Sequence, residues 1–345
     1  MKSLITRWFG ARETQEPGSA IQAIDVPPPA LIFRADATLP IVDWDALEPQ
    51  APPGEDPARL DAFWTSAART WLEHLGAHLG AAYAVSESDS FLLLSPLNGR
   101  TARGVLDYVE KTRKRVLRIL EGIADESGSG KFCVLVLASE DEYYGYVSNY
   151  HYADGEYALS AGMFINHGYG HFVFVQDHLS TIEPTIAHEL THCMLQHLTI
   201  PAWLNEGIAV STERRLAPPP GRPLYTPEEM HQKHLDYWTQ TTIQEFWSGK
   251  SWRRQDDGNM LSYDLATHFV SMIANDFDAF RAFVNEADLG DGGDAAARER
   301  LGFPIEHLAE AVLGAGPWAP TPETWYEGVE RGQFPRRRTG LVPRL

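Results

Sequence analysis

Two histidines and one glutamate lie within five consecutive residues near the middle of the chain. His188, Glu189 and His192 belong to an H-E-x-x-H pentad. If this stretch is helical, the two histidines lie one turn apart and project from the same face. Two imidazoles in this arrangement can bind one zinc ion, and Glu189 is close enough to act as a base on a water molecule at that site.

A zinc site that hydrolyses its substrate generally has a third protein ligand and an open fourth position. Glu206 is the best candidate for the third ligand, because Pro201 interrupts the helical pattern and makes the chain reverse. Glu189 would then be free to take a proton from water as the water attacks a carbonyl, and to deliver it to the leaving amine. The alternative is an ordinary helix with two solvent-facing histidines. The helix break and the following Asn205 and Gly207 favour a zinc hydrolase.

The helix that carries the pentad has an apolar stripe on the side opposite the histidines. We expect one face of this helix to anchor in a core while the other faces a cleft. Pro184 suits the first turn of this helix, and a second helix that carries Glu206 is expected from Trp203 onward. The stripe consists of Ile186, Leu190, Met194 and Leu198.

The segment HELTH followed by PAWLNEGIA resembles the gluzincin metallopeptidases, in particular the aminopeptidase N-like branch and its bacterial peptidase-MA-like relatives. The resemblance is close over residues 185–211. It implies that His188, His192 and Glu206 hold one zinc ion per chain and that Glu189 is the general base. It also implies a tyrosine on a downstream helix that donates a hydrogen bond to the developing oxyanion. Tyr263 is our candidate for this tyrosine, and a purely structural tyrosine packed among helices is the alternative.

The chain departs from the pattern of this family in three places. The connection between His192 and Glu206 is shorter than in the aminopeptidase branch. The thermolysin branch has an aspartate four positions after its ligand glutamate, where this chain has Val210, so the residue that orients a zinc-bound histidine is not identified. Residues 162–166 lie where the aminopeptidases have G-x-M-E-N, but they lack the glutamate that binds the free amine of the substrate.

The remaining elements predict an α+β fold, in which a small mixed sheet with packed helices carries the H-E-x-x-H helix. A mainly helical C-terminal subdomain follows, and the resemblance implies a thermolysin-like catalytic architecture. We expect an arm at 1–55, an α+β subdomain at 56–216, a helical subdomain at 217–330 that closes the cleft, and a basic tail at 331–345. Helices are expected at 57–79, 101–124, 260–284 and 305–313 and from Thr226 onward, and strands at 91–94, 132–137 and 170–175.

Two of these segments allow more than one interpretation. The Pro-rich arm is expected to be extended, and it could dock a partner or block the cleft. The strand at 170–175 could pair with an extended peptide as an edge strand, or it could lie inside the sheet.

The composition argues against several classes of partner. A net charge of −18 repels the phosphates of nucleic acid. No apolar run reaches the length of a membrane span, and the N-terminus lacks the pattern of a signal peptide. Two cysteines, Cys133 and Cys193, lie in apolar runs and indicate a reducing, cytoplasmic location. Outside the motif, His171, His178, His197, His231 and His234 are expected to be hydrogen-bonded core or surface residues.

The sequence therefore predicts a zinc-dependent metallopeptidase with a peptide or protein substrate. One alternative is a zinc hydrolase of a non-peptide amide. Another is a zinc-stabilised binding or regulatory protein without turnover. Glu189 argues against this last alternative, because zinc binding alone does not need it.

Overall fold

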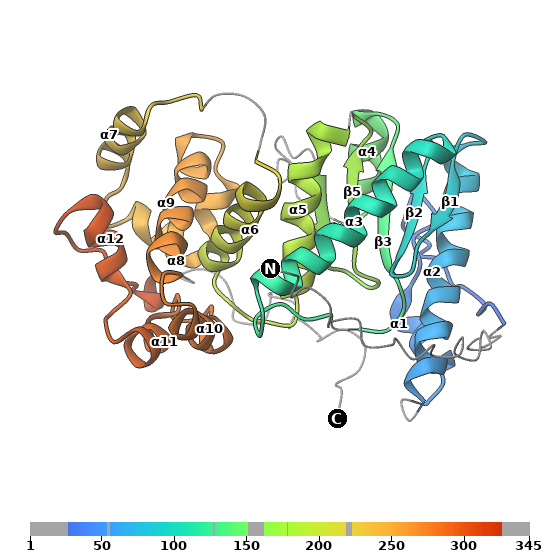
Figure 1. The fold of residues 1–345 in the computed structure, drawn as a ribbon, viewed down its shortest axis with the longest axis horizontal. Helices are drawn as coiled ribbons and strands as arrows, with labels where there is room; N and C mark the ends of the chain where they lie inside the picture. Colours follow the sequence, from blue (N-terminus) through green and yellow to red (C-terminus); the bar gives the residue numbers. More distant parts are fainter. Residues whose placement is uncertain are drawn as a thin grey trace, which may run out of the picture.

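A computed structural model describes residues 27–53, 56–126, 128–150, 162–177, 179–218 and 223–325 of the chain. It shows a mixed α and β protein in which a sheet with flanking helices occupies one side and a group of helices occupies the other (Figure 1). The helix α5 (Leu179–Leu195), which carries the H-E-x-x-H pentad, lies between these two parts.

Five described strands form one mixed sheet in the order β1-β2-β3-β5-β4. The three central strands run parallel, and β1 and β4 pair antiparallel at the two edges. The sheet contains the three strands predicted from the sequence, and β5 lies inside it, so this strand is not the free edge. The bounds are β1 (Ala84–Glu87), β2 (Phe91–Ser95), β3 (Phe132–Leu137), β4 (Gly162–Ile165) and β5 (His171–Val175).

Both faces of the central strands are covered by helices, which explains why these strands read as continuous apolar runs. Successive side chains of a strand point to opposite faces. Phe91 and Leu93 therefore contribute to one core, together with apolar residues of α3 (Gly99–Ile119) and α5. Leu92 and Leu94 contribute to the other core, with α2 (Pro57–Leu79) and α4 (Glu140–Val147).

The helix boundaries follow the capping signals of the sequence. The Asp56 side chain accepts a hydrogen bond from the Arg59 amide at the start of α2, and Gly80 ends that helix with a φ of 133°. Thr226 and Glu229 form a capping box at the start of α7 (Pro227–Tyr237). These signals are local, and sequence reasoning could therefore predict them.

Part of the N-terminal arm belongs to the core. Residues 1–26 lie outside the described residues, but α1 (Trp44–Leu47) is a short helix followed by the 3-10 turn η1 (Glu48–Gln50). Trp44 is buried and packs edge-on against Trp71, with ring centroids 5.5 Å apart. The expected extended arm therefore ends before residue 41, where Ile41 and Val42 are already buried.

Helices dominate the second half of the chain, as predicted. The helix expected at 260–284 is divided in two, because Asp276 caps the start of a new helix. The elements are α6 (Ala202–Leu216), α8 (Thr242–Ser248), η2 (Lys250–Arg253), α9 (Asp257–Ile273), α10 (Phe277–Glu286), α11 (Asp294–Ala296), η3 (Ala297–Leu301), α12 (Glu306–Leu313) and η4 (Pro322–Thr324).

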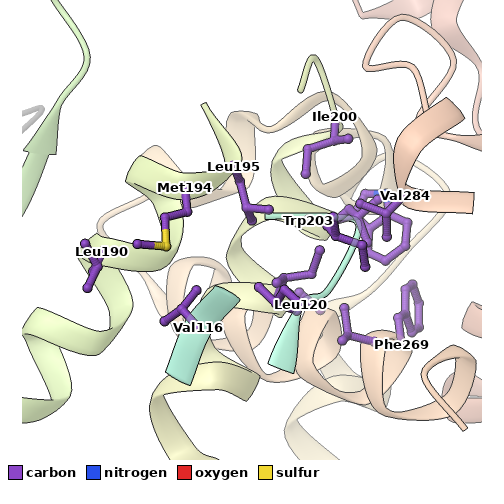
Figure 2. Close-up of a cluster of buried hydrophobic side chains, with 14 of the residues drawn as sticks. Val116, Leu120, Leu190, Met194, Leu195, Ile200, Trp203, Phe269 and Val284 are labelled. Carbon is purple, nitrogen blue, oxygen red and sulfur yellow. The ribbon is translucent and has the colours of Figure 1, made fainter. Parts of the chain in front are cut away.

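One continuous apolar cluster joins the sheet part to the helical part. Figure 2 shows Leu190, Met194 and Leu195 of α5 on one side of this cluster, and Trp203 of α6 with Phe269 of α9 on the other. Burial of each such side chain contributes roughly 1.5–3 kcal/mol. The packing on the apolar side of α5 therefore fixes the directions of the polar side chains on its other face.

Two observations concern the membrane and the cysteines. Among the described residues, no helix combines the length and apolar character needed to cross a membrane. Cys133 and Cys193 are buried and form no disulfide. Burial raises the pKa of the Cys193 thiol well above its ordinary value, which fits a small apolar side chain better than a metal ligand.

The helices α6 and α9 pack closely against each other at Gly207, the residue after Glu206. A Cβ atom at Gly207 would lie 2.6 Å from the carbonyl oxygen of Ala266 and 2.7 Å from a methyl group of Val270. Backbone cannot give way as a side chain can, so any larger residue here must push α9 away from α6.

We therefore predict that Gly207→Ala lowers the free energy of unfolding by about 1–3 kcal/mol, because the added methyl group separates two packed helices. Urea unfolding monitored by circular dichroism measures this change. The matched control is Gly104→Ala in α3, where nothing lies within 4 Å of the new Cβ. The control should stabilise the protein or leave it unchanged, since alanine favours helix more than glycine. Equal effects of the two substitutions would contradict the close approach of α6 and α9.

Candidate metal centre

The two histidines of the pentad and the glutamate of the next helix meet between α5 and α6. His188 Nε2 and His192 Nε2 are 3.0 Å apart, and each lies 3.4 Å from Glu206 Oε2. These three side chains are the one group among the described residues whose atoms could together hold a metal ion. The structure thus brings together the three ligands predicted from the sequence.

The helices themselves produce this meeting. His188 and His192 are one turn apart in α5, as the spacing predicts, but α5 begins at Leu179, so Pro184 lies inside it and not in its first turn. The chain then turns through residues 196–201, and α6 begins after Pro201. This short connection suffices to place Glu206, in the second turn of α6, opposite the histidines.

The spacing of the three atoms fits a tetrahedral metal site. With zinc bonds of 2.0–2.1 Å, tetrahedral geometry places neighbouring ligand atoms about 3.3 Å apart. The observed separations of 3.0 Å and 3.4 Å bracket that value. The Glu206 Oε2 atom is buried and has no hydrogen-bond donor among the described residues. A buried carboxylate oxygen without a donor is costly unless a cation satisfies it.

The other ring nitrogen of each histidine has an acceptor of its own. His188 Nδ1 donates to Glu213 Oε2 at 3.0 Å, and His192 Nδ1 donates to the side-chain oxygen of Asn205 at 3.1 Å. In its neutral form, which a metal ligand requires, each ring would carry its proton on Nδ1 and direct the lone pair of Nε2 toward its neighbour and toward Glu206. This is the tautomer that a metal-binding histidine needs.

These two partners were not found from the sequence. The family pattern places such a partner at position 210, where the side chain of valine cannot accept a hydrogen bond. Glu213 lies seven residues after Glu206, which is two helical turns, so it projects from the same face of α6. Helical spacing was the signal that could have identified it. For Asn205, adjacency to the ligand Glu206 was the only signal.

The electrostatics of the cluster favour a positive charge between the ligands. Burial alone would lower the pKa of His188, but the nearby carboxylates of Glu206, Glu213 and Glu189 raise it to about 10. Burial would raise the pKa of Glu206, but the charges of His192 and His188 close to its carboxylate lower it well below its ordinary value. The negative potential that retains a proton here would equally favour a metal cation.

Glu189 lies beside the cluster without being part of it. Its charge raises the pKa values of His188, His192 and Tyr263, so the carboxylate is within electrostatic range of all three. In the part of the chain that the structure describes, no hydrogen bond or ion pair joins this carboxylate to another residue. Only 9% of the residue is exposed. A shielded carboxylate without a structural partner is suited to accept a proton.

Tyr263 lies in α9, which packs against α6. Burial raises the pKa of Tyr263 well above its ordinary value, and the charges of Glu206, Glu189 and Glu213 raise it further. The phenol is therefore protonated at neutral pH and lies in the field of the same carboxylates that surround the metal ligands. A neutral phenol in this position is able to donate a hydrogen bond.

The other histidines have hydrogen-bonding or surface roles, as the sequence predicts, where they can be observed. His171 is buried and bonded to Tyr146 Oη and to the carbonyl oxygen of Tyr169, both at 2.7 Å. His234 is buried and bonded to Asp264, while His197 and His231 are exposed. His178 lies outside the described residues.

Comparison of the sequence with protein-family models and with curated proteins finds no match. The chemical interpretation of the site therefore depends on its own geometry and on the short H-E-x-x-H and N-E-G motifs.

We predict that Glu213→Gln weakens zinc binding by roughly 10- to 100-fold, because a neutral amide increases the basicity of His188 less than a carboxylate does. Competition with a chromophoric chelator gives the dissociation constants. Glu310→Gln in α12, at an exposed position, is the control and should bind zinc as the wild type does. Equal affinities of the Glu213 variant and the wild type would show that this hydrogen bond does not orient a metal ligand.

Proposed function

We propose that this chain is a zinc-dependent metallopeptidase of the gluzincin type, with a thermolysin-like catalytic architecture. The observation that carries the proposal is the convergence of His188 Nε2, His192 Nε2 and Glu206 Oε2. The carboxylate of Glu189 lies beside them, and it has no partner among the described residues. Two histidines and one glutamate form the donor set typical of hydrolytic zinc sites with an open position.

Zinc held by these residues would polarise the scissile carbonyl and make the attacking water more acidic. Glu189 takes the proton of this water during the attack and transfers it to the nitrogen of the leaving amine. Asn205 and Glu213 hold the two imidazole rings in place throughout. Tyr263 donates a hydrogen bond to the carbonyl oxygen as negative charge develops on it.

The edge strand β4 supports an extended peptide as the substrate. Among the described strands it pairs only with β5, and it packs against α5. At Gly162 a Cβ atom would lie 2.5 Å from Thr185 of α5, so backbone and helix are in direct contact there. A peptide that adds to the sheet beside residues 163–165 of β4 would run alongside the helix that carries the pentad.

The same strand argues against an aminopeptidase. Ile165 occupies the position at which the aminopeptidase branch has its amine-binding glutamate, and this isoleucine is buried. A free amino terminus would therefore find no carboxylate at that position of β4.

The freedom of Glu189 also favours catalysis over a purely structural metal site. A metal that only stabilises the fold needs its ligands and their hydrogen-bond partners, and Glu189 is neither. Hydrolysis of a non-peptide amide would use the same groups, and a comparison of substrates separates it from peptide hydrolysis.

We predict that Glu189→Gln lowers kcat on a mixed peptide library by roughly 10²- to 10⁴-fold while zinc remains bound, because the amide cannot accept the proton of water. Mass spectrometry of the digested library measures the cleavage, and elemental analysis measures the zinc. Glu183→Gln in the same helix is the matched control, and it should cleave normally. Full activity of the Glu189 variant would contradict the proposed function. If the wild type cleaved non-peptide amides and no peptide, the alternative function, hydrolysis of a non-peptide amide, would be assigned.

A further inference from the structure

Tyr263 is held in place by contacts that the proposed chemistry does not use. Its ring lies edge-on against Trp252 of η2, with centroids 6.2 Å apart. The carbonyl oxygen of Trp252 accepts a hydrogen bond from Asn259 at 2.5 Å, and Ser262 Oγ donates to Ser251 Oγ at 2.6 Å. The segment η2 is therefore attached to α9 by two hydrogen bonds from residues that precede the tyrosine.

The aromatic contacts continue from Trp252 to α7. Trp252 stacks on Phe246 with centroids 5.2 Å apart, and Phe246 lies edge-on against Trp238 at 5.7 Å. The indole N–H of Trp238 donates to His234 Nδ1 at 2.8 Å. His234 is the one described residue of α7 that is fully buried, with 1% of its surface exposed.

The hydrogen bonds of His234 define its tautomer. An indole N–H can only donate, so His234 Nδ1 accepts, and the ring proton is on Nε2. This nitrogen lies 3.0 Å from Asp264 Oδ2, in the residue next to Tyr263. Burial would raise the pKa of Asp264, but the hydrogen bonds from His234 and His268 lower it well below its ordinary value, so the acceptor is an ionised carboxylate.

These contacts form a closed ring that begins and ends at α9. From Tyr263 it passes to Trp252, Phe246 and Trp238, then to His234, and returns through Asp264. In the described part of the chain, the Tyr263 hydroxyl makes no hydrogen bond that would orient the side chain. Its position therefore depends on the packing of its ring and on the placement of its helix.

We propose that His234 is a positioning residue that fixes the Tyr263 side chain relative to the metal-binding residues, through Asp264 on one side and the aromatic contacts of Trp238, Phe246 and Trp252 on the other. This inference rests on the proposed function for the role of Tyr263 in hydrolysis. The position of the side chain can be tested without any activity.

The test compares His234→Phe with His231→Phe in protein labelled with 3-fluorotyrosine. Phenylalanine keeps a flat ring at position 234 but removes both hydrogen bonds, whereas His231 is an exposed residue of the same helix. The ¹⁹F resonance that disappears in Tyr263→Phe belongs to Tyr263. We expect this resonance to shift or broaden in His234→Phe and to stay unchanged in His231→Phe, with zinc content equal in both. Asp264→Asn, which keeps the size of the side chain, should produce a smaller shift of the same resonance.

On a cleaved peptide, His234→Phe should lower kcat by about ten- to a hundredfold and change KM little, since misplacing a catalytic group affects mainly the transition state. The double variant with Tyr263→Phe should be no slower than Tyr263→Phe alone. An unchanged Tyr263 resonance in both His234→Phe and Asp264→Asn would overturn the inference, as would a double variant with additive losses. A wild type that cleaves no peptide would contradict the proposed function, and the resonances would still decide whether His234 positions Tyr263.

Discussion

The packing of α5 against α6 is the constraint on which the candidate site depends. The apolar side of α5 is buried in the cluster that joins the sheet to the helical half. This packing fixes the rotation of α5 about its axis, and therefore the direction in which its two histidines project. The chain reverses immediately after α5. Because Gly207 has no side chain, α9 can pack closely against α6. Glu206 is thereby held against both imidazoles.

This arrangement concentrates electron-rich atoms where they repel one another. Two imidazole lone pairs and one buried carboxylate oxygen point to a common centre, with Glu189 and Glu213 nearby. Such a cluster is unfavourable unless it holds a proton or a metal cation. Folding energy from the apolar cluster therefore offsets a local electrostatic cost, which is a common property of functional sites.

Local signals in the sequence predicted the parts of the structure that depend on short-range order. The helical spacing of His188 and His192, the break at Pro201 and the cap at Asp56 each act within a few residues, and the structure contains all three features. The strands β2, β3 and β5 were recognisable because both of their faces are buried, which makes them continuously apolar. The mixed character of the sheet follows the prediction as well.

The features that sequence reasoning missed depend on distant partners or on weak patterns. The strands β1 and β4 are four residues long and lie at the edges of the sheet, so neither has a distinct pattern. Trp44 packs against the rings of Trp71 and Tyr169, which lie far along the chain. No local pattern in the Pro-rich segment around Trp44 indicates this packing. The bonds from Asn205 and Glu213 to the histidines, and the ring of contacts at Tyr263, arise only when separate helices pack together.

The central claim is that His188, His192 and Glu206 hold one zinc ion, and metal analysis of the purified protein tests it most directly. Elemental analysis of the chain, before and after reconstitution with zinc and removal of excess metal, gives the stoichiometry. The geometry predicts about one zinc per chain, and predicts that Glu206→Ala loses most of it, because two imidazoles alone leave the site without its charged ligand. A wild-type protein that retains no zinc even after reconstitution would contradict the metal centre and the chemistry proposed for it.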